Sequence, residues 1–242
     1  MAVYVTGDKH QRFDSLWFFA DRMKLTEQDY IIVLGDMGLF WRHDKKDANE
    51  IIKYFEKNYK FNLYFIDGNH ENFKLLNALE EDENHMGYIS EHIRHLKRGR
   101  TYNIDGKKIL ALGGADSVDK LRRTPGLSWW EEEAITDNDI ARVDNGVHYD
   151  YVLSHCCPLS IFNNNKPYLC TLGNIVDNSD PELHKSENKL EQVLNFIEFG
   201  HWLFRSLSYW HRPRWKVFMS LSQLERINLR TLFNNYIILI LI

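Results

Sequence analysis

The sequence has few cysteines and no apolar run of membrane-spanning length. Its three cysteines, Cys156, Cys157 and Cys170, form no Cys-x-x-Cys spacing, and a sparse, odd number is more typical of a reducing compartment than of a disulfide-stabilised secreted protein. The longest apolar run, residues 237–242, is far shorter than the ~20 residues that cross a bilayer. Residues 1–8 show neither the basic region nor the cleavage site of a signal peptide. We therefore expect a cytoplasmic protein with no membrane partner.

A strong excess of one charge is also absent. The formal net charge of the 242 residues is −4, with 44% hydrophobic and 26% charged residues, which is ordinary for a soluble globular protein. A mild negative charge does not favour nucleic-acid binding by bulk electrostatics, although it leaves room for a local basic patch. The length suits a single domain with a substantial core.

Short apolar runs alternate with amphipathic stretches over the first two-thirds of the chain. The runs of strand length, rich in β-branched or aromatic residues, are Val3–Val5, Tyr30–Leu34, Leu63–Ile66, Ile109–Leu112 and Tyr151–Leu153. The helix-like segments are residues 15–23, 48–59 and 73–79. This alternation predicts βαβ units around a largely parallel, buried sheet.

Polar residues follow four of these runs at the point where each strand should end. The four stretches are Gly7-Asp8-Lys9-His10, Gly35-Asp36-Met37-Gly38, Asp67-Gly68-Asn69-His70-Glu71 and Ser154-His155. One Gly-Asp pair would be ordinary turn chemistry. Four such stretches behind successive strands instead indicate a ligand site at the carboxyl ends of the strands, where open α/β sheets bind their ligands.

Carboxylate, amide and imidazole donors of this kind suit Mn, Fe, Zn or Mg better than a soft-metal thiolate site. A carboxylate such as Asp36 can bridge two cations ~3.5–4 Å apart, as in two-metal phosphoryl-transfer sites. In such a site the cations polarise the phosphoryl oxygens, and a hydroxide that bridges them attacks phosphorus in line.

In this order, Asp8-x-His10, Gly35-Asp36, Gly68-Asn69-His70-Glu71 and a strand-end His155 resemble the successive motifs of calcineurin-like metallophosphoesterases over roughly residues 1–204. The Gly-Asn-His-Glu element is the most specific part. The resemblance implies a metal-dependent phosphomonoesterase or phosphodiesterase with a phosphate-ester substrate. It also implies an α/β fold, a four-layer α-β-β-α sandwich of two mixed sheets flanked by helices.

The resemblance also implies a role for each site residue. Asp8 and His10 would hold the first metal, Asp36 would bridge, and Asn69 and His155 would hold the second. His70 would be catalytic, as a proton donor to the leaving oxygen or as a stabiliser of the transition state. Two divalent ions are expected, with manganese favoured. A strand-end histidine before Cys-Cys-Pro could also simply cap a loop.

Three arginines are weaker candidates for substrate binding. Arg42 follows the second motif, and Arg122 and Arg123 follow the segment 113–119, which resembles a stretch in some bacterial and phage-like members of the family. Arginines near a phosphate site can clamp it with paired hydrogen bonds. Exposed surface charge explains them equally well.

The family pattern ends with Gly-His-x-His, which supplies one further ligand to each metal, and this element is missing. Residues 201–204 have the character of the apolar strand that should precede the motif, so the motif is due at Arg205-Ser206-Leu207-Ser208. Codons for these residues can be chosen so that, read one base further on, the same nucleotides encode Gly-His-Tyr-His. We hypothesise that one extra base after the Phe204 codon has shifted the frame.

The composition of the tail agrees with this hypothesis. Residues 205–242 carry six Lys or Arg and one Glu, a balance of +5, against 24 basic and 33 acidic residues, a balance of −9, in residues 1–204. The uncharged, β-prone run at residues 237–242 is an aggregation hazard. We therefore divide the chain into a phosphoesterase domain, residues 1–204, and an aberrant, out-of-frame tail, residues 205–242. An authentic divergent tail is the alternative.

Two function classes remain open. The first is a phosphoesterase whose activity is impaired in this chain by the lost ligands. The second is a catalytically dead remnant or binding module that keeps the fold. A nuclease would need a basic groove that the −9 balance of residues 1–204 does not indicate. The sequence determines neither the substrate nor the oligomeric state, and it does not show whether His201 or His211 replaces a lost ligand.

Overall fold

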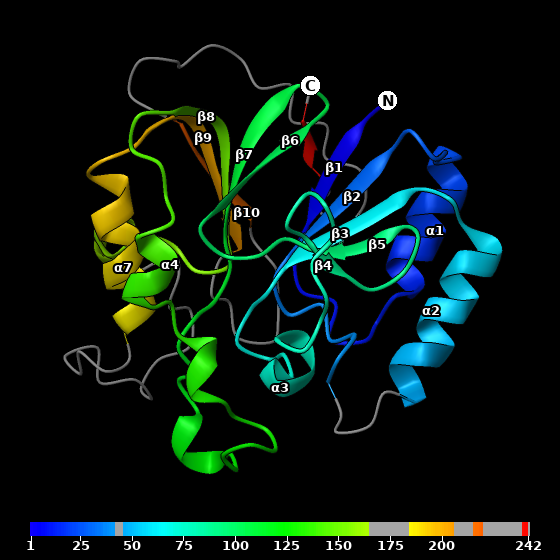
Figure 1. The fold of residues 1–242 in the computed structure, drawn as a ribbon, viewed down its shortest axis with the longest axis horizontal. Coiled ribbons are helices and arrows are strands. Elements are labelled where there is room, and N and C mark those ends of the chain that lie inside the picture. Colours follow the sequence, from blue (N-terminus) through cyan, green and yellow to red (C-terminus); the bar gives the residue numbers. More distant parts are fainter. Residues whose placement is uncertain (42–45, 165–183, 206–214, 220–238, 242) are drawn as a thin grey trace.

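The computed structural model describes residues 1–41, 46–164, 184–205, 215–219 and 239–241. Two β-sheets pack face to face, and helices cover the outer face of each sheet (Figure 1). Both sheets mix parallel and antiparallel strands. The expected α/β sandwich of two mixed sheets between helical layers is therefore confirmed.

The first sheet has the strand order β11-β1-β2-β3-β5-β4. Its strands are β1 (Val3–Thr6), β2 (Tyr30–Leu34), β3 (Asn62–Ile66), β4 (Gly87–Tyr88), β5 (Ile93–His95) and β11 (Leu239–Leu241). Neighbours from β1 to β5 run parallel, whereas β4 and β11 pair antiparallel at the two edges. The parallel register aligns the carboxyl ends of β1, β2 and β3.

The second sheet has the order β10-β9-β8-β7-β6. Its strands are β6 (Arg100–Ile104), β7 (Lys107–Leu112), β8 (His148–Ser154), β9 (Glu198–Arg205) and β10 (Trp215–Met219). Strands β7, β8 and β9 are parallel, with Ser154 of β8 opposite both Leu112 and Phe204. These three strands therefore also end at one edge.

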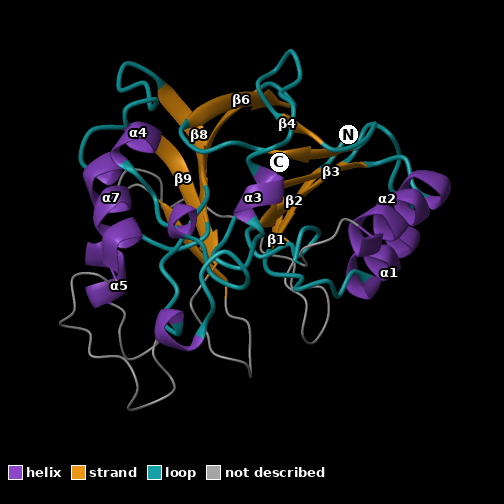
Figure 2. Cartoon of the chain, turned by 60° about the horizontal axis from the view of Figure 1, so that its bottom comes forward, coloured by secondary structure: helices purple, strands orange, loops and turns teal. Residues whose placement is uncertain are grey.

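Helices α1 (Asp14–Met23) and α2 (Lys46–Asn58) cover the first sheet, and α4 (Asp137–Ile140), α5 (Leu159–Asn164) and α7 (Lys185–Leu194) cover the second (Figure 2). The short helix α3 (Phe73–Leu76) follows β3, and 3-10 turns occupy Lys120–Arg122 and Glu131–Glu133. Within the described ranges, none of the helices is long and apolar enough to cross a membrane.

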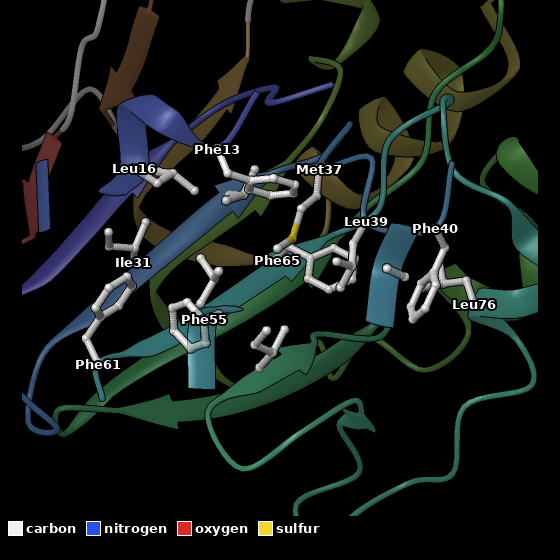
Figure 3. Close-up of a cluster of buried hydrophobic side chains, with 14 of the residues drawn as sticks. Phe13, Leu16, Ile31, Met37, Leu39, Phe40, Phe55, Phe61, Phe65 and Leu76 are labelled. Atoms are coloured by element: carbon white, nitrogen blue, oxygen red, sulfur yellow. The ribbon is translucent and has the colours of Figure 1, made fainter. Parts of the chain in front are cut away.

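Aromatic and aliphatic side chains fill the space between the first sheet and its helices (Figure 3). Leu16 of α1 and Phe55 of α2 lie over Ile31 and Phe65, all of them buried. Met37, just beyond β2, belongs to the same cluster. Because the cluster continues past the strand end, it also fixes the loop that carries Asp36.

The predicted strands and the first two helices agree with the structure to within a few residues at each end. The third helix ends at Leu76, three residues earlier than expected. The apolar run expected at 201–204 is the carboxyl half of β9. The strands β4, β5 and β6 were not predicted, since they lack the apolar runs that mark the central strands.

A buried ion pair joins the loop after β3 to the second half of the molecule. The Asp67 carboxylate accepts from Arg98 Nε at 2.7 Å and contacts His95 Nε2 at 3.0 Å. The Arg98 guanidinium also donates to the backbone oxygens of Glu133 and Ala134, at 3.0 and 2.8 Å. Asp67 directly precedes Gly68-Asn69, so this pair anchors one of the loops of the predicted site.

Replacing Arg98 by methionine should lower the free energy of unfolding by ~3–5 kcal/mol, because the Asp67 charge would stay buried without its partner. Urea unfolding measures the loss. The matched control is Arg142→Met, which breaks an ion pair with Asp139 in which the arginine is half-exposed and should cost no more than ~1 kcal/mol. Equal losses in the two variants would contradict the anchoring role of Arg98.

Candidate metal centre

Four loops at the carboxyl ends of the strands carry the predicted metal ligands. Asp8 follows β1, Asp36 follows β2 and Asn69 follows β3, while His155 comes from the second sheet, directly after β8. The main chain links two of the loops, because the Asp36 carbonyl oxygen accepts from the backbone N–H groups of Lys9 and His10, both at 2.9 Å. The site therefore lies where the two sheets meet.

Asp8, Asp36 and His155 bring their ligand atoms closest together. Their carboxylate oxygens and imidazole nitrogens lie within 4.8 Å of one another. His10 adds a second imidazole, with Nε2 3.3 Å from Asp8 Oδ2 and 3.6 Å from Asp36 Oδ2. Two carboxylates and two imidazoles thus face one small volume.

The backbone is strained where it presents these groups. His10 and Asp36 adopt φ angles of 44° and 49°, in the left-handed region that non-glycine residues rarely occupy. Strain of this kind costs of order 1–3 kcal/mol per residue and tends to collect at functional sites. The hydrogen bonds and the buried core on either side of the loops hold both residues in place.

Two glycines allow the close approach of the site side chains. A Cβ atom on Gly35 would lie 2.2 Å from His155 Nδ1, and one on Gly68 would lie 2.2 Å from Asp36 Oδ1. Gly35 also has a φ of +84°. Any larger residue at either position would therefore push a predicted ligand out of place.

His155 has the environment of a metal-ligating histidine. Its Nδ1–H donates to the Leu34 carbonyl oxygen at 2.7 Å, and its Nε2 lies 3.5 Å from Asp36 Oδ2. A backbone carbonyl that fixes one ring nitrogen is the usual support of such a ligand. Burial alone would lower the pKa of His155, but the Asp36 carboxylate raises it above its ordinary value. Asp36 therefore attracts positive charge at this point.

The donor set fits divalent cations. Asp36 is 3% exposed; burial acts to raise its pKa, but His155, His70 and His10 hold the pKa below its ordinary value. A buried, ionised carboxylate beside a second carboxylate is costly unless cationic charge lies between them. Oxygen and imidazole donors are the ligands that Mn, Zn, Fe and Mg accept.

A second group of possible ligands, Glu56, Glu91 and His92, lies at the surface between α2 and β5. There His92 Nδ1 already pairs with Glu56 Oε2 at 2.7 Å, and Glu91 is exposed. Neither a strained backbone nor a close glycine accompanies this group. The Asp8–Asp36–His155 cluster is thus the better built of the two.

His70 lies beside the Asp8–Asp36–His155 cluster, in contact with an aromatic ring, a carboxylate and a guanidinium group. Its ring stacks on Trp41, with centroids 5.3 Å apart, and its backbone N–H donates to Asp36 Oδ1 at 2.9 Å. Burial lowers the pKa of His70 to about 4, although Asp36 opposes the shift. Arg123 Nη2 lies 2.8 Å from His70 Nε2. Because the guanidinium can only donate, a neutral His70 carries its proton on Nδ1.

Of the three arginines predicted as candidates for substrate binding, the structure places one beside the site. Arg123 has a buried side chain, pairs with Asp119 Oδ1 at 2.7 Å and contacts His70, so it belongs to the surroundings of the site. Arg122 is exposed on the neighbouring 3-10 turn. Arg42 lies outside the described residues.

His201 does not lie at the strand ends. It pairs with Tyr151 in the β8–β9 register and stacks on the Tyr151 ring, with centroids 5.3 Å apart. The pair that reaches the edge is Ser154 with Phe204, three positions further along. Phe204 therefore lies at the strand-end edge that carries His155, whereas His201 lies three residues behind that edge.

Several supporting residues were not predicted. Glu71, which is 1% exposed, accepts from the Met37 backbone N–H at 2.8 Å and so ties the Gly-Asn-His-Glu loop to the Asp36 loop. Ser117 accepts from Asn69 Nδ2 at 2.9 Å, and Glu133 contacts Ser117. The sequence indicated only that the segment containing Ser117 resembles a family stretch; Glu133, within a run of three glutamates, gave no signal.

Comparison with known protein families gives one match. A model of the calcineurin-like phosphoesterase family matches residues 1–202. A search of curated proteins gave no significant match. The matched range includes Asp8, His10, Asp36, Asn69 and His155.

Substituting alanine for Gly68 should weaken manganese binding by ~10-fold or more, because its Cβ would displace Asp36, and losses around a metal site cost ~10–100-fold even beyond the direct ligands. Isothermal titration with Mn²⁺ measures the change. In the matched control, Gly146→Ala, the new Cβ comes no closer than 3.4 Å to Asp144, so affinity should not change. Unaltered affinity in Gly68→Ala would contradict the placement of the metal against Asp36.

Proposed function

Because the chain belongs to the calcineurin-like phosphoesterase family, a family of metal-dependent phosphoester hydrolases, we propose that it is built to hydrolyse phosphate esters with two divalent metal ions. The observation that carries this proposal is the convergence of Asp8, Asp36 and His155 within 4.8 Å. Asp8 and His10 would hold one metal, Asp36 would bridge, and Asn69 and His155 would hold the other.

Two cations held by these residues would supply Lewis acidity, polarising the phosphoryl group and lowering the pKa of a bound water molecule. The residues of the chain position and complete this chemistry. His70 lies next to Asp36 and would act on the leaving oxygen, by proton donation or by stabilising the developing charge. Arg123 holds the Nε2 side of His70, so the group that His70 presents is Nδ1–H.

The site of this chain is proposed to be incomplete. Strand β9 runs parallel to β8 and ends at Arg205, with Phe204 opposite Ser154. Residues 206–208, like His211, lie outside the described residues. In the sequence, Arg205-Ser206-Leu207-Ser208 stands where the family has Gly-His-x-His. A one-base frame change after the Phe204 codon would account for the loss.

The second candidate is a non-catalytic remnant that keeps the fold and one weakly held metal. The observation that favours it is the same missing element, since each metal would be one protein ligand short. We further propose that manganese is the preferred ion and that the protein acts in the cytoplasm; these remain predictions from the donor set and from the sparse cysteines.

Removing one base after the Phe204 codon should restore activity. With added Mn²⁺, turnover of an aryl phosphate by the restored protein should exceed that of the present chain by ~100-fold or more, because two direct ligands return where supporting contacts alone are worth ~10–100-fold. The restored protein carrying Asp36→Asn is the control for contaminating phosphatase. Equal turnover, or codons that cannot encode Gly-His-x-His in another frame, would contradict the frame change.

A further inference from the structure

The side chain of Asn69 poses an orientation problem. Its amide has an oxygen that accepts and a nitrogen that donates, in nearly the same shape. Only the oxygen can ligate a cation, so a half-turn of the amide would place two N–H groups against the metal instead. The groups that hydrogen-bond to the other end of the Asn69 amide therefore decide whether Asn69 can serve as a ligand.

Two buried residues are linked to the amide nitrogen of Asn69 by hydrogen bonds. Asn69 Nδ2 lies 2.9 Å from Ser117 Oγ, and Ser117 Oγ lies 2.9 Å from Glu133 Oε2. Ser117 and Glu133 are each 2% exposed. The three side chains form a continuous chain of hydrogen bonds that leads from the site loop after β3 to the 3-10 turn Glu131–Glu133.

The chemistry of Glu133 sets the direction of this chain. Above pH 7 Glu133 is ionised and its carboxylate can only accept, so the Ser117 hydroxyl must donate its single proton to Glu133. A Ser117 lone pair is then left to accept from Asn69 Nδ2, and Asn69 Oδ1 is left for the cation. If the Asn69 amide were turned round, its oxygen would face Ser117 Oγ. The single proton of that hydroxyl is already donated to Glu133, so the two oxygens would have no hydrogen bond between them.

The position of Glu133 is itself fixed. Its Oε1 accepts from the Ser117 backbone N–H and from Trp129 Nε1, both at 2.8 Å. Its backbone oxygen accepts from Arg98 Nη2 at 3.0 Å, and Arg98 is held by Asp67, two residues before Asn69. The acceptor therefore has little freedom to rotate away from Ser117.

We propose that Ser117 and Glu133 are positioning residues that orient the Asn69 amide, so that its oxygen rather than its nitrogen faces the metal. That Asn69 is a ligand rests on the proposed function. The hydrogen-bond chain is a property of the protein without metal, and it can be tested separately.

Glu133→Gln tests the direction of the chain with almost no change of shape. If the new amide nitrogen takes the place of Oε2, it donates to Ser117, the hydroxyl then donates toward Asn69, and the Asn69 amide turns round. The matched control is Glu132→Gln, the same replacement on the same 3-10 turn at an exposed residue. Because burial raises the pKa of Glu133 to about 7, all measurements are made at pH 8, where the carboxylate is ionised.

The first measurement needs no metal. In the full chain labelled with ¹⁵N-asparagine, the side-chain N–H₂ signals of Asn69 are assigned by their loss in Asn69→Asp. We expect these protons to exchange slowly with solvent and to shift strongly in Glu133→Gln and Ser117→Ala, but not in Glu132→Gln. Asn69 signals that are the same in Glu133→Gln as in the unmodified chain would overturn the proposal.

The second measurement is Mn²⁺ titration by calorimetry. Glu133→Gln should lower the affinity by ~10–100-fold, and Glu132→Gln should not. An aspartate at position 69 has two equivalent oxygens and needs no orienting, and the Ser117 hydroxyl freed by Glu133→Gln can donate to it, so in the Asn69→Asp background Glu133→Gln should not lower the affinity. An equal loss in both backgrounds would show a general structural role and overturn the proposal.

The two measurements separate failure of this inference from failure of the proposed function. If the unmodified chain and its frame-restored form bind no Mn²⁺, the metal centre is wrong, while the exchange data still decide the hydrogen-bond chain. If Mn²⁺ binds and Glu133→Gln changes neither the Asn69 signals nor the affinity, the metal centre stands and the orienting role is wrong.

Discussion

The approach of two carboxylates, the partly buried Asp8 and the buried Asp36, at the ends of adjacent parallel strands is the constraint on which the rest of the site depends. Like charges so close together are costly in a protein interior unless cationic charge lies between them. His155 and His10 turn nitrogens toward the same volume. The chain belongs to the calcineurin-like phosphoesterase family, and this cluster is the candidate group of ligands that we propose as its metal centre.

The surrounding fold keeps these groups in a strained arrangement. Gly35 and Gly68 leave room for His155 and Asp36, and the positive φ of Asp36 is held by hydrogen bonds to neighbouring loops. The Asp67–Arg98 pair then connects the loop after β3 to the second half of the molecule. Contacts made by residues that are not themselves ligands, such as Gly35, Gly68 and Arg98, therefore determine where the ligand atoms lie.

Much of this could be predicted from sequence, because parallel strands buried on both faces are continuous apolar runs. Tyr30–Leu34 is a strand with those bounds, and Asp36 follows it. The roles of Ser117 and Glu133 could not be predicted. They lie far from Asn69 in sequence, and only the packing of the two sheets brings them together. The short strand β4 was missed because it has no apolar pattern of its own.

The most direct test of the metal centre is anomalous X-ray diffraction from crystals of the full chain soaked with Mn²⁺. The account predicts an anomalous peak bounded by Asp8, Asp36 and His155, with His10 beside it. A crystal with no peak at that position, or with manganese only at the surface group of Glu56, Glu91 and His92, would contradict it.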